Sequence, residues 1–131
     1  MRLAALPCLL LVMAVSVAAD NAPPTVVKPL LNKDIVGAPG KELVLLAVDY
    51  IPGGSSLPHR HDAQVFVYVL EGEVTMQVKG GVPQSLHAGD TFYESPEDVH
   101  TVSANASTKA HAKLLVFMVK EKGAPPTRPA D

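Results

Sequence analysis

The most informative segment of the chain spans residues 53–72 and reads GGSSLPHRHDAQVFVYVLEG. It joins a glycine- and proline-rich lead-in, two histidines one residue apart and an apolar run that closes at a glycine. In an extended strand, residues i and i+2 project from the same face about 7 Å apart, so His59 and His61 are expected to point the same way. Two adjacent imidazoles are typical ligands of a borderline divalent metal, although such pairs also occur at exposed loop edges.

The sequence on both sides of this segment has the periodicity of strands. Short apolar segments rich in valine, isoleucine and aromatic residues are separated by glycine, proline, asparagine and aspartate, and no amphipathic helix is predicted beyond residue 19. The runs at residues 43–48 and 65–70 are nearly continuous, which predicts strands covered on both faces. We therefore predict an all-β barrel or sandwich with strands at Leu30–Val36, Leu43–Ile51, Val65–Leu70, Val74–Lys79, Thr91–Tyr93, Val99–Val102 and Lys113–Lys120.

The first nineteen residues differ from the rest of the chain. Arg2 precedes an apolar run that reaches Ala19, and small residues at positions 17–19 resemble a cleavage site. This pattern predicts a signal peptide over residues 1–19 and an exported protein, periplasmic or secreted, with an uncleaved membrane anchor as the alternative. Cleavage would remove Cys8, the only cysteine, and would thereby exclude disulfides and cysteine nucleophiles.

Length and composition predict one small domain. Residues 20–29 and the proline-rich residues 123–131 are expected to be extended tails, with the barrel between them at residues 30–122. Lysine and arginine total 11 against 13 acidic residues and are scattered singly, which argues against a nucleic-acid partner. No membrane partner is expected after signal cleavage.

Two segments between Gly53 and about Asn105 together resemble the two motifs of the cupin superfamily. The matching residues are Gly53, His59, His61 and Gly72 in the first motif and Gly89, Asp90 and His100 in the second, with Pro96 one position late and Asn105 near the usual closing asparagine. The resemblance implies a small jelly-roll β-barrel in which His59, His61 and His100 bind one metal. The ion would be divalent Mn, Fe, Ni, Cu or Zn, because imidazole selects poorly among them.

The chain departs from the family pattern at one ligand. The resemblance would place a glutamate four or five residues after the second histidine, where this sequence has Val65 or Phe66. Gln64 is the nearest polar substitute, and its side chain would reach the metal only if a β-bulge turned it inward. Without it, three neutral nitrogens would leave the charge of the ion to water or to an anionic ligand.

Three classes of function remain open on the sequence. Three-histidine cupins include dioxygenases that act on thiols and diketones, so the resemblance permits a small-molecule oxidoreductase. A barrel that binds a small ligand without turnover, and a structural barrel with no metal, are the alternatives. The expected partner is a small-molecule substrate or ligand, for which an anion would suit the metal charge, and a homodimer is left open.

The remaining polar and aromatic residues are assigned ordinary roles. Glu94 is expected to be a solvated turn residue, with a general base as the alternative. His87 and His111 are expected on the surface. Core packing is expected for the aromatic residues of the predicted strands, which are Phe66, Tyr68, Phe92, Tyr93 and Phe117. For Tyr93, the alternative is that its side chain lines a cavity.

Overall fold

The computed structural model describes residues 25–130 as ten strands with no helix. The signal peptide predicted over residues 1–19 lies outside the described residues. The strands are β1 (Thr25–Asp34), β2 (Lys41–Tyr50), β3 (His59–Arg60), β4 (Gln64–Glu71), β5 (Glu73–Val78), β6 (Gln84–His87), β7 (Thr91–Glu94), β8 (His100–Asn105), β9 (Ala112–Glu121) and β10 (Arg128–Pro129). No helix in residues 25–130 is long and apolar enough to cross a membrane.

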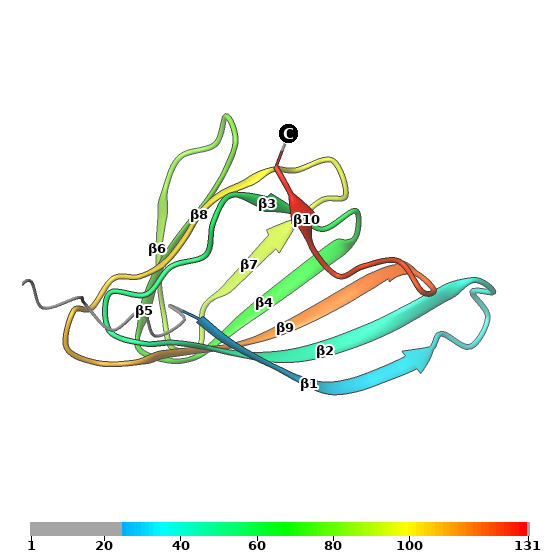
Figure 1. Cartoon of the computed structure of the whole chain (residues 1–131), viewed down its shortest axis with the longest axis horizontal. Coiled ribbons are helices and arrows are strands. Elements are labelled where there is room, and N and C mark those ends of the chain that lie inside the picture. The colour runs from blue at the N-terminus through cyan, green and yellow to red at the C-terminus, as the bar shows by residue number, and fades with distance from the viewer. Residues whose placement is uncertain (1–24, 131) are drawn as a thin grey trace, which may run out of the picture.

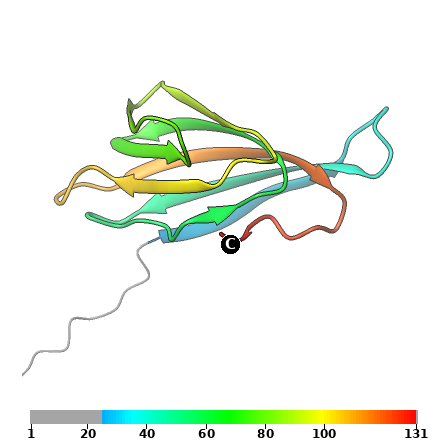
Figure 2. The same ribbon diagram turned by 90° about the horizontal axis from the view of Figure 1, so that it is seen from above.

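The strands form two antiparallel sheets of five strands each. One sheet has the order β1-β2-β9-β4-β7 and the other the order β10-β3-β8-β5-β6. Figure 1 shows the long strands β1, β2 and β9 along one side and β5, β6 and β8 on the other, and Figure 2 shows the two layers from above. The all-β, jelly-roll type of fold predicted from the sequence is confirmed.

The core lies between the sheets and is built from alternate residues of each strand. In β2 and β9 every second side chain is buried, as the two-residue period of a strand requires. The buried apolar residues are Val44, Leu46, Val48, Tyr50, Ala63, Val65, Val67, Val69, Val74, Met76, Leu86, Phe92, Ala112, Leu114, Val116 and Met118. Only one face of each sheet is packed in this way.

The exposure of residues on the outer face of the first sheet contradicts two predictions. The apolar run at residues 65–70 is not covered on both sides, because Phe66 and Tyr68 are 44% and 42% exposed. Tyr93, which pairs with Phe66 across β4 and β7, is 50% exposed and does not point into the space between the sheets. Core packing was therefore wrong for Phe66, Tyr68 and Tyr93 and correct for Phe92. Phe117 is half-buried on the same outer face.

Strand positions differ from the prediction mainly near the chain ends. β1 begins at Thr25. Residues 25–29, the second half of the predicted N-terminal tail, therefore belong to this strand and pair with β2. Residues 128–129 of the predicted C-terminal tail pair with β3. Three strands, β3, β6 and β10, were not predicted, because two of them have only two residues and β6 is largely polar.

Gly72 forms the turn between β4 and β5 and has a conformation that only glycine adopts without strain. Its φ is +78°, and a Cβ atom there would lie 2.6 Å from the carbonyl oxygen of His111. The backbone of the residue before β9 therefore occupies the space that a side chain would need.

We expect the Gly72→Ala variant to lose about 2 kcal/mol or more of unfolding free energy in urea denaturation, because strain and a backbone clash add. Gly80→Ala is the matched control, since Gly80 has φ +83° and no atom within 4 Å of the added Cβ. The control should lose only the strain contribution, about 1–2 kcal/mol. Equal losses in the two variants would contradict the proposed clash.

Candidate metal centre

Three histidines meet at one end of the space between the sheets. His59 is the first residue of the short strand β3, and His61 directly follows this strand. His59 is the register partner of His100 on β8. The ring centroids of His59 lie 4.7 Å from His61 and 5.1 Å from His100, and one nitrogen of each ring lies within 4.8 Å of the others. His61 and His100 are buried, whereas His59 is half-buried. The structure thus brings together the three histidines selected from the sequence.

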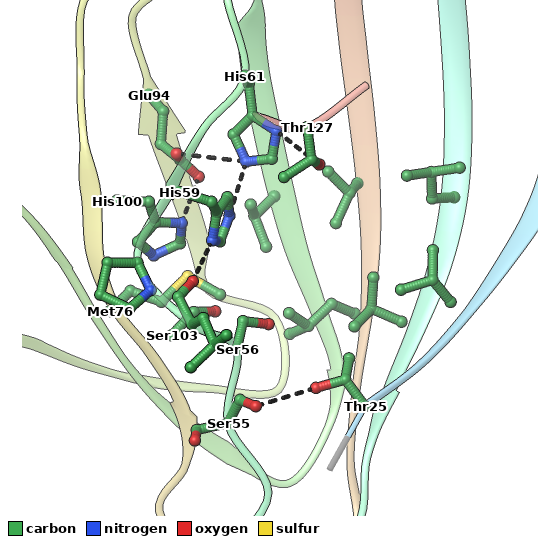
Figure 3. Close-up of a pocket in the computed structure, with 18 of the residues that line it drawn as sticks. Thr25, Ser55, Ser56, His59, His61, Met76, Glu94, His100, Ser103 and Thr127 are labelled. Atoms are coloured by element: carbon green, nitrogen blue, oxygen red, sulfur yellow. Dashed lines mark hydrogen bonds and ion pairs between the residues drawn. The ribbon is translucent and has the colours of Figure 1, made fainter. Parts of the chain in front are cut away.

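Backbone carbonyls fix how two of the rings are protonated. His59 Nδ1 lies 2.7 Å from the Leu57 carbonyl oxygen, and His61 Nδ1 lies 2.9 Å from that of Pro126. A carbonyl can only accept, so each Nδ1 carries the hydrogen and each neutral ring has its lone pair on Nε2. The two Nε2 atoms face each other at 3.1 Å (Figure 3). Two lone pairs at this distance repel unless a cation or a proton lies between them.

A metal ion fits this arrangement better than a proton. Burial lowers the pKa of His59, so a neutral ring is favoured there. Both ring nitrogens of His100 are buried. Its Nδ1 lies 3.0 Å from a carboxylate oxygen of Glu94, whereas its Nε2 has no polar partner within residues 25–130, which is costly for a polar group. Phe92 stacks on His100 with ring centroids 5.7 Å apart and holds its ring in place. A bound ion would accept one nitrogen lone pair from each of the three rings.

Glu94 is the site residue that the sequence analysis missed. It is 2% exposed, so the prediction of a solvated turn residue was wrong. Its Oε1 lies 3.0 Å from His100 Nδ1, and its Oε2 lies 3.6 Å from His61 Nε2. The predicted strand ends at Tyr93, but β7 continues for one more residue, and its alternation places Phe92 and Glu94 on the same inner face.

Gln64 is not brought to the histidines. It is exposed at the start of β4 and does not line the cavity, whereas its neighbours Ala63 and Val65 are buried. No bulge is present at this position, so the strand period turns Gln64 outward. The suggestion of Gln64 as a fourth ligand is therefore corrected. His87 and His111 are exposed, as expected.

A cavity of about 600 Å³ adjoins the three histidines. The inner face of the first sheet forms its apolar wall, with side chains of Leu46, Val48, Val67, Leu114, Val116 and Met118. At the end of β2 in this same sheet, Tyr50 Oη lies 2.6 Å from Oγ of Ser103 on β8 and 2.8 Å from Ser56 Oγ. Burial raises the pKa of Tyr50, which keeps its phenol protonated. The cavity therefore offers an apolar body with polar groups at the histidines and at this hydroxyl cluster.

Residues 124–130, the C-terminal strap, run along β3 and line the cavity. Besides the Pro126 carbonyl that binds His61, Arg128 forms a two-point ion pair with Asp62. Asp62 has φ +48°, an uncommon conformation for a residue other than glycine, and the arginine lowers the pKa of its carboxyl group. The strap thus holds the residue next to His61 as well as His61 itself.

We expect the Arg128→Ala variant to loosen the C-terminal strap, because the ion pair to Asp62 is lost. Backbone amides of residues 124–130 should exchange with deuterium severalfold faster, as measured by mass spectrometry. Lys122→Ala is the control, since Lys122 pairs with Asp34 on the surface and does not line the cavity. An equal increase in the exchange rate of residues 124–130 in both variants would show that the ion pair between Arg128 and Asp62 does not hold the strap.

Comparison with known proteins identifies the family of this fold. Residues 46–118 match the family model described as "Cupin domain". No curated protein sequence matches the chain. Among solved structures, an oxalate oxidase in complex with glycolate is 22% identical, with a TM-score of 0.64 over 84% of this chain. The chain spans only 57% of that protein's length.

Two further solved structures are similar. The polyketide cyclase RemF from Streptomyces resistomycificus is 23% identical, with a TM-score of 0.62 over 82% of this chain and 72% of its own. The DMSP lyase DddQ from Ruegeria pomeroyi DSS-3 is 19% identical, with a TM-score of 0.67 over 87% of this chain and 55% of its own. At these identities the likeness concerns the fold alone.

Proposed function

The chain belongs to the cupin domain family, and on this basis we propose that it is an exported, metal-dependent oxidoreductase that uses dioxygen on a small molecule. The metal would be held by His59, His61 and His100. The observation that carries the proposal is the pair of Nε2 atoms 3.1 Å apart, whose rings are already anchored through Nδ1. Such anchoring is usual for histidines that bind metals.

The donor set suits a borderline divalent ion of Mn, Fe, Ni, Cu or Zn. When bound, such an ion would supply a Lewis acid with open positions for a substrate oxygen and for dioxygen. The chain's own residues would do the rest. The apolar wall of the cavity would exclude water, and the Tyr50 hydroxyl would donate a hydrogen bond to a second oxygen of the substrate.

The dimensions of the cavity favour a small, mainly apolar substrate with one or two oxygen or sulfur donors. About 600 Å³ is in the range of small-molecule sites. The similar structures are named as an oxidase, a cyclase and a lyase, which supports an enzyme in this fold but not one reaction. The choice of dioxygen chemistry rests on the resemblance to three-histidine cupins that oxidise diketones and thiols.

The alternative is a barrel that binds a small ligand without turnover. The sequence supported this alternative because it showed no evident general base. The buried carboxylate of Glu94 weakens that argument, because the histidine cluster contains an acidic group that was not expected there from the sequence. The enzyme is therefore the preferred proposal. Export is proposed from residues 1–19 of the sequence.

Oxygen uptake by the untagged protein, loaded in turn with each of the five metals, tests the proposal. We expect uptake above background with one metal and with one substrate class from a panel of 1,3-diketones and small thiols. The His59→Ala/His61→Ala double variant should show none. Binding of a panel compound without oxygen uptake or product would favour the ligand-binding alternative.

A further inference from the structure

Glu94 is a buried acidic side chain within the three-histidine cluster. Its Oε1 lies 3.0 Å from His100 Nδ1, and its Oε2 lies 3.6 Å from His61 Nε2 (Figure 3). Donor atoms that surround one ion at about 2.1 Å are themselves about 3.0–3.4 Å apart. The carboxylate therefore stands at about the spacing from the imidazoles that ligands of a shared ion have.

A cation bound among the three histidines would have the carboxylate of Glu94 beside it. A carboxylate that is 2% exposed is costly when ionised unless an opposite charge compensates it. Its ion-pair partners within residues 25–130 are the rings of His61 and His100, which are charged only when protonated. Arg128 also lines the cavity, but its guanidinium pairs with Asp62. A divalent ion among the imidazoles would compensate Glu94 without protonating either ring.

The strand register explains why the carboxylate comes from β7. Val65 and Glu94 are partners across the β4–β7 pair, and both are buried. Directly opposite residues of an antiparallel pair share a face, with Cβ atoms about 5 Å apart. Val65 is one of the two positions at which the sequence analysis expected a glutamate and found an apolar residue. The acidic group therefore lies one strand away, on the same inner face.

We propose that Glu94 is the fourth protein ligand of the metal and its only anionic one. This inference rests on the proposed metal centre at His59, His61 and His100. A three-histidine, one-carboxylate set leaves a net charge of +1 on a divalent centre instead of +2. A centre with the lower charge attracts anionic ligands less strongly than a centre of +2. It therefore favours neutral substrates that bind through a carbonyl or hydroxyl oxygen.

Cobalt(II) titration of the untagged protein tests the inference, with affinity and the visible absorption bands of the bound ion as readouts. We expect one site per chain in the native protein. Glu94→Val should weaken binding at least 100-fold and shift the bands, because an anionic ligand is lost. Val65→Glu/Glu94→Val should restore affinity to within about tenfold of native, since the carboxylate returns to the same face from β4.

Two controls keep the outcomes distinct. Metal-free Glu94→Val should still unfold in one cooperative transition above the temperature of the titration, which would show that lost affinity does not reflect unfolding. Glu94→Gln keeps the size of the side chain and removes its charge, and should also shift the cobalt bands.

The outcomes separate this inference from the proposed function. Native affinity and native bands in Glu94→Val would overturn the assignment of Glu94. Weak binding with native bands in Glu94→Gln, and no rescue by the double variant, would make Glu94 a positioning residue for His100 and would also overturn it. A native protein that binds no cobalt would overturn the three-histidine centre itself.

Discussion

Replacing His100 by leucine is expected to abolish metal binding and to destabilise the metal-free protein. His100 is 3% exposed, and its Nδ1 lies 3.0 Å from Oε1 of the buried Glu94. Leucine removes one of the three nitrogen donors and leaves the Glu94 carboxylate without its nearest partner. A buried polar group without a partner costs about 1–3 kcal/mol, so urea denaturation without metal should show a loss of that size.

His111→Leu is the matched control for this experiment. His111 is exposed, and its Nδ1 lies 2.7 Å from Asp49 Oδ1, away from the cavity. Its replacement should change neither metal affinity nor the stability of the metal-free protein by more than a few tenths of a kcal/mol. A metal-free His100→Leu protein as stable as native would show that the contact between His100 and Glu94 contributes nothing to folding, and native metal affinity in this variant would contradict His100 as a ligand.

The second large effect is stabilisation by the metal. In the metal-free protein, the lone pairs of the two Nε2 atoms repel each other at 3.1 Å, and the carboxylate of Glu94 is buried beside them. A bound cation would attract the lone pairs and the carboxylate. A ligand that binds only the folded state adds about 4 kcal/mol at a free concentration 1,000 times its Kd. For a domain of this size we expect a rise of about 15 °C or more in Tm. A chelator in excess should reverse it.

The His59→Ala/His61→Ala variant is the control for the thermal experiment. Its Tm should not respond to metal, because two of the three nitrogen donors are absent. An equal metal-dependent rise in this variant would place the stabilising site elsewhere in the protein. No rise in the native protein would contradict the metal as a structural partner of the histidines.

Local patterns predicted the strands and the first two candidate ligands. Two histidines one residue apart on an extended segment point the same way by strand geometry alone, and His59 and His61 do so. His100 required the resemblance to a family, because only long-range pairing brings β8 against β3. The buried and exposed faces of β4 were not separable, since both carry apolar side chains and only the inner face is covered by the second sheet.

Long-range geometry explains what the sequence could not provide. Glu94 joins the cluster because β7 pairs with β4, and the sequence does not state that register. The Pro126 carbonyl orients His61 from a segment 65 residues away, and any residue type provides a carbonyl. Gln64 was selected for its chemistry, but the period of the strand determined its direction. Contacts through the backbone and across strands leave little trace in one sequence.

Elemental analysis of the untagged protein tests the central claim most directly. About one transition-metal ion per chain is expected in the native protein, and a value near zero in the His59→Ala/His61→Ala variant prepared in the same way. The identity of the ion would then select the metal for the oxygen-uptake experiment. A native protein that holds no metal even after reconstitution with each of the five ions would contradict the metal centre and the oxidoreductase built on it.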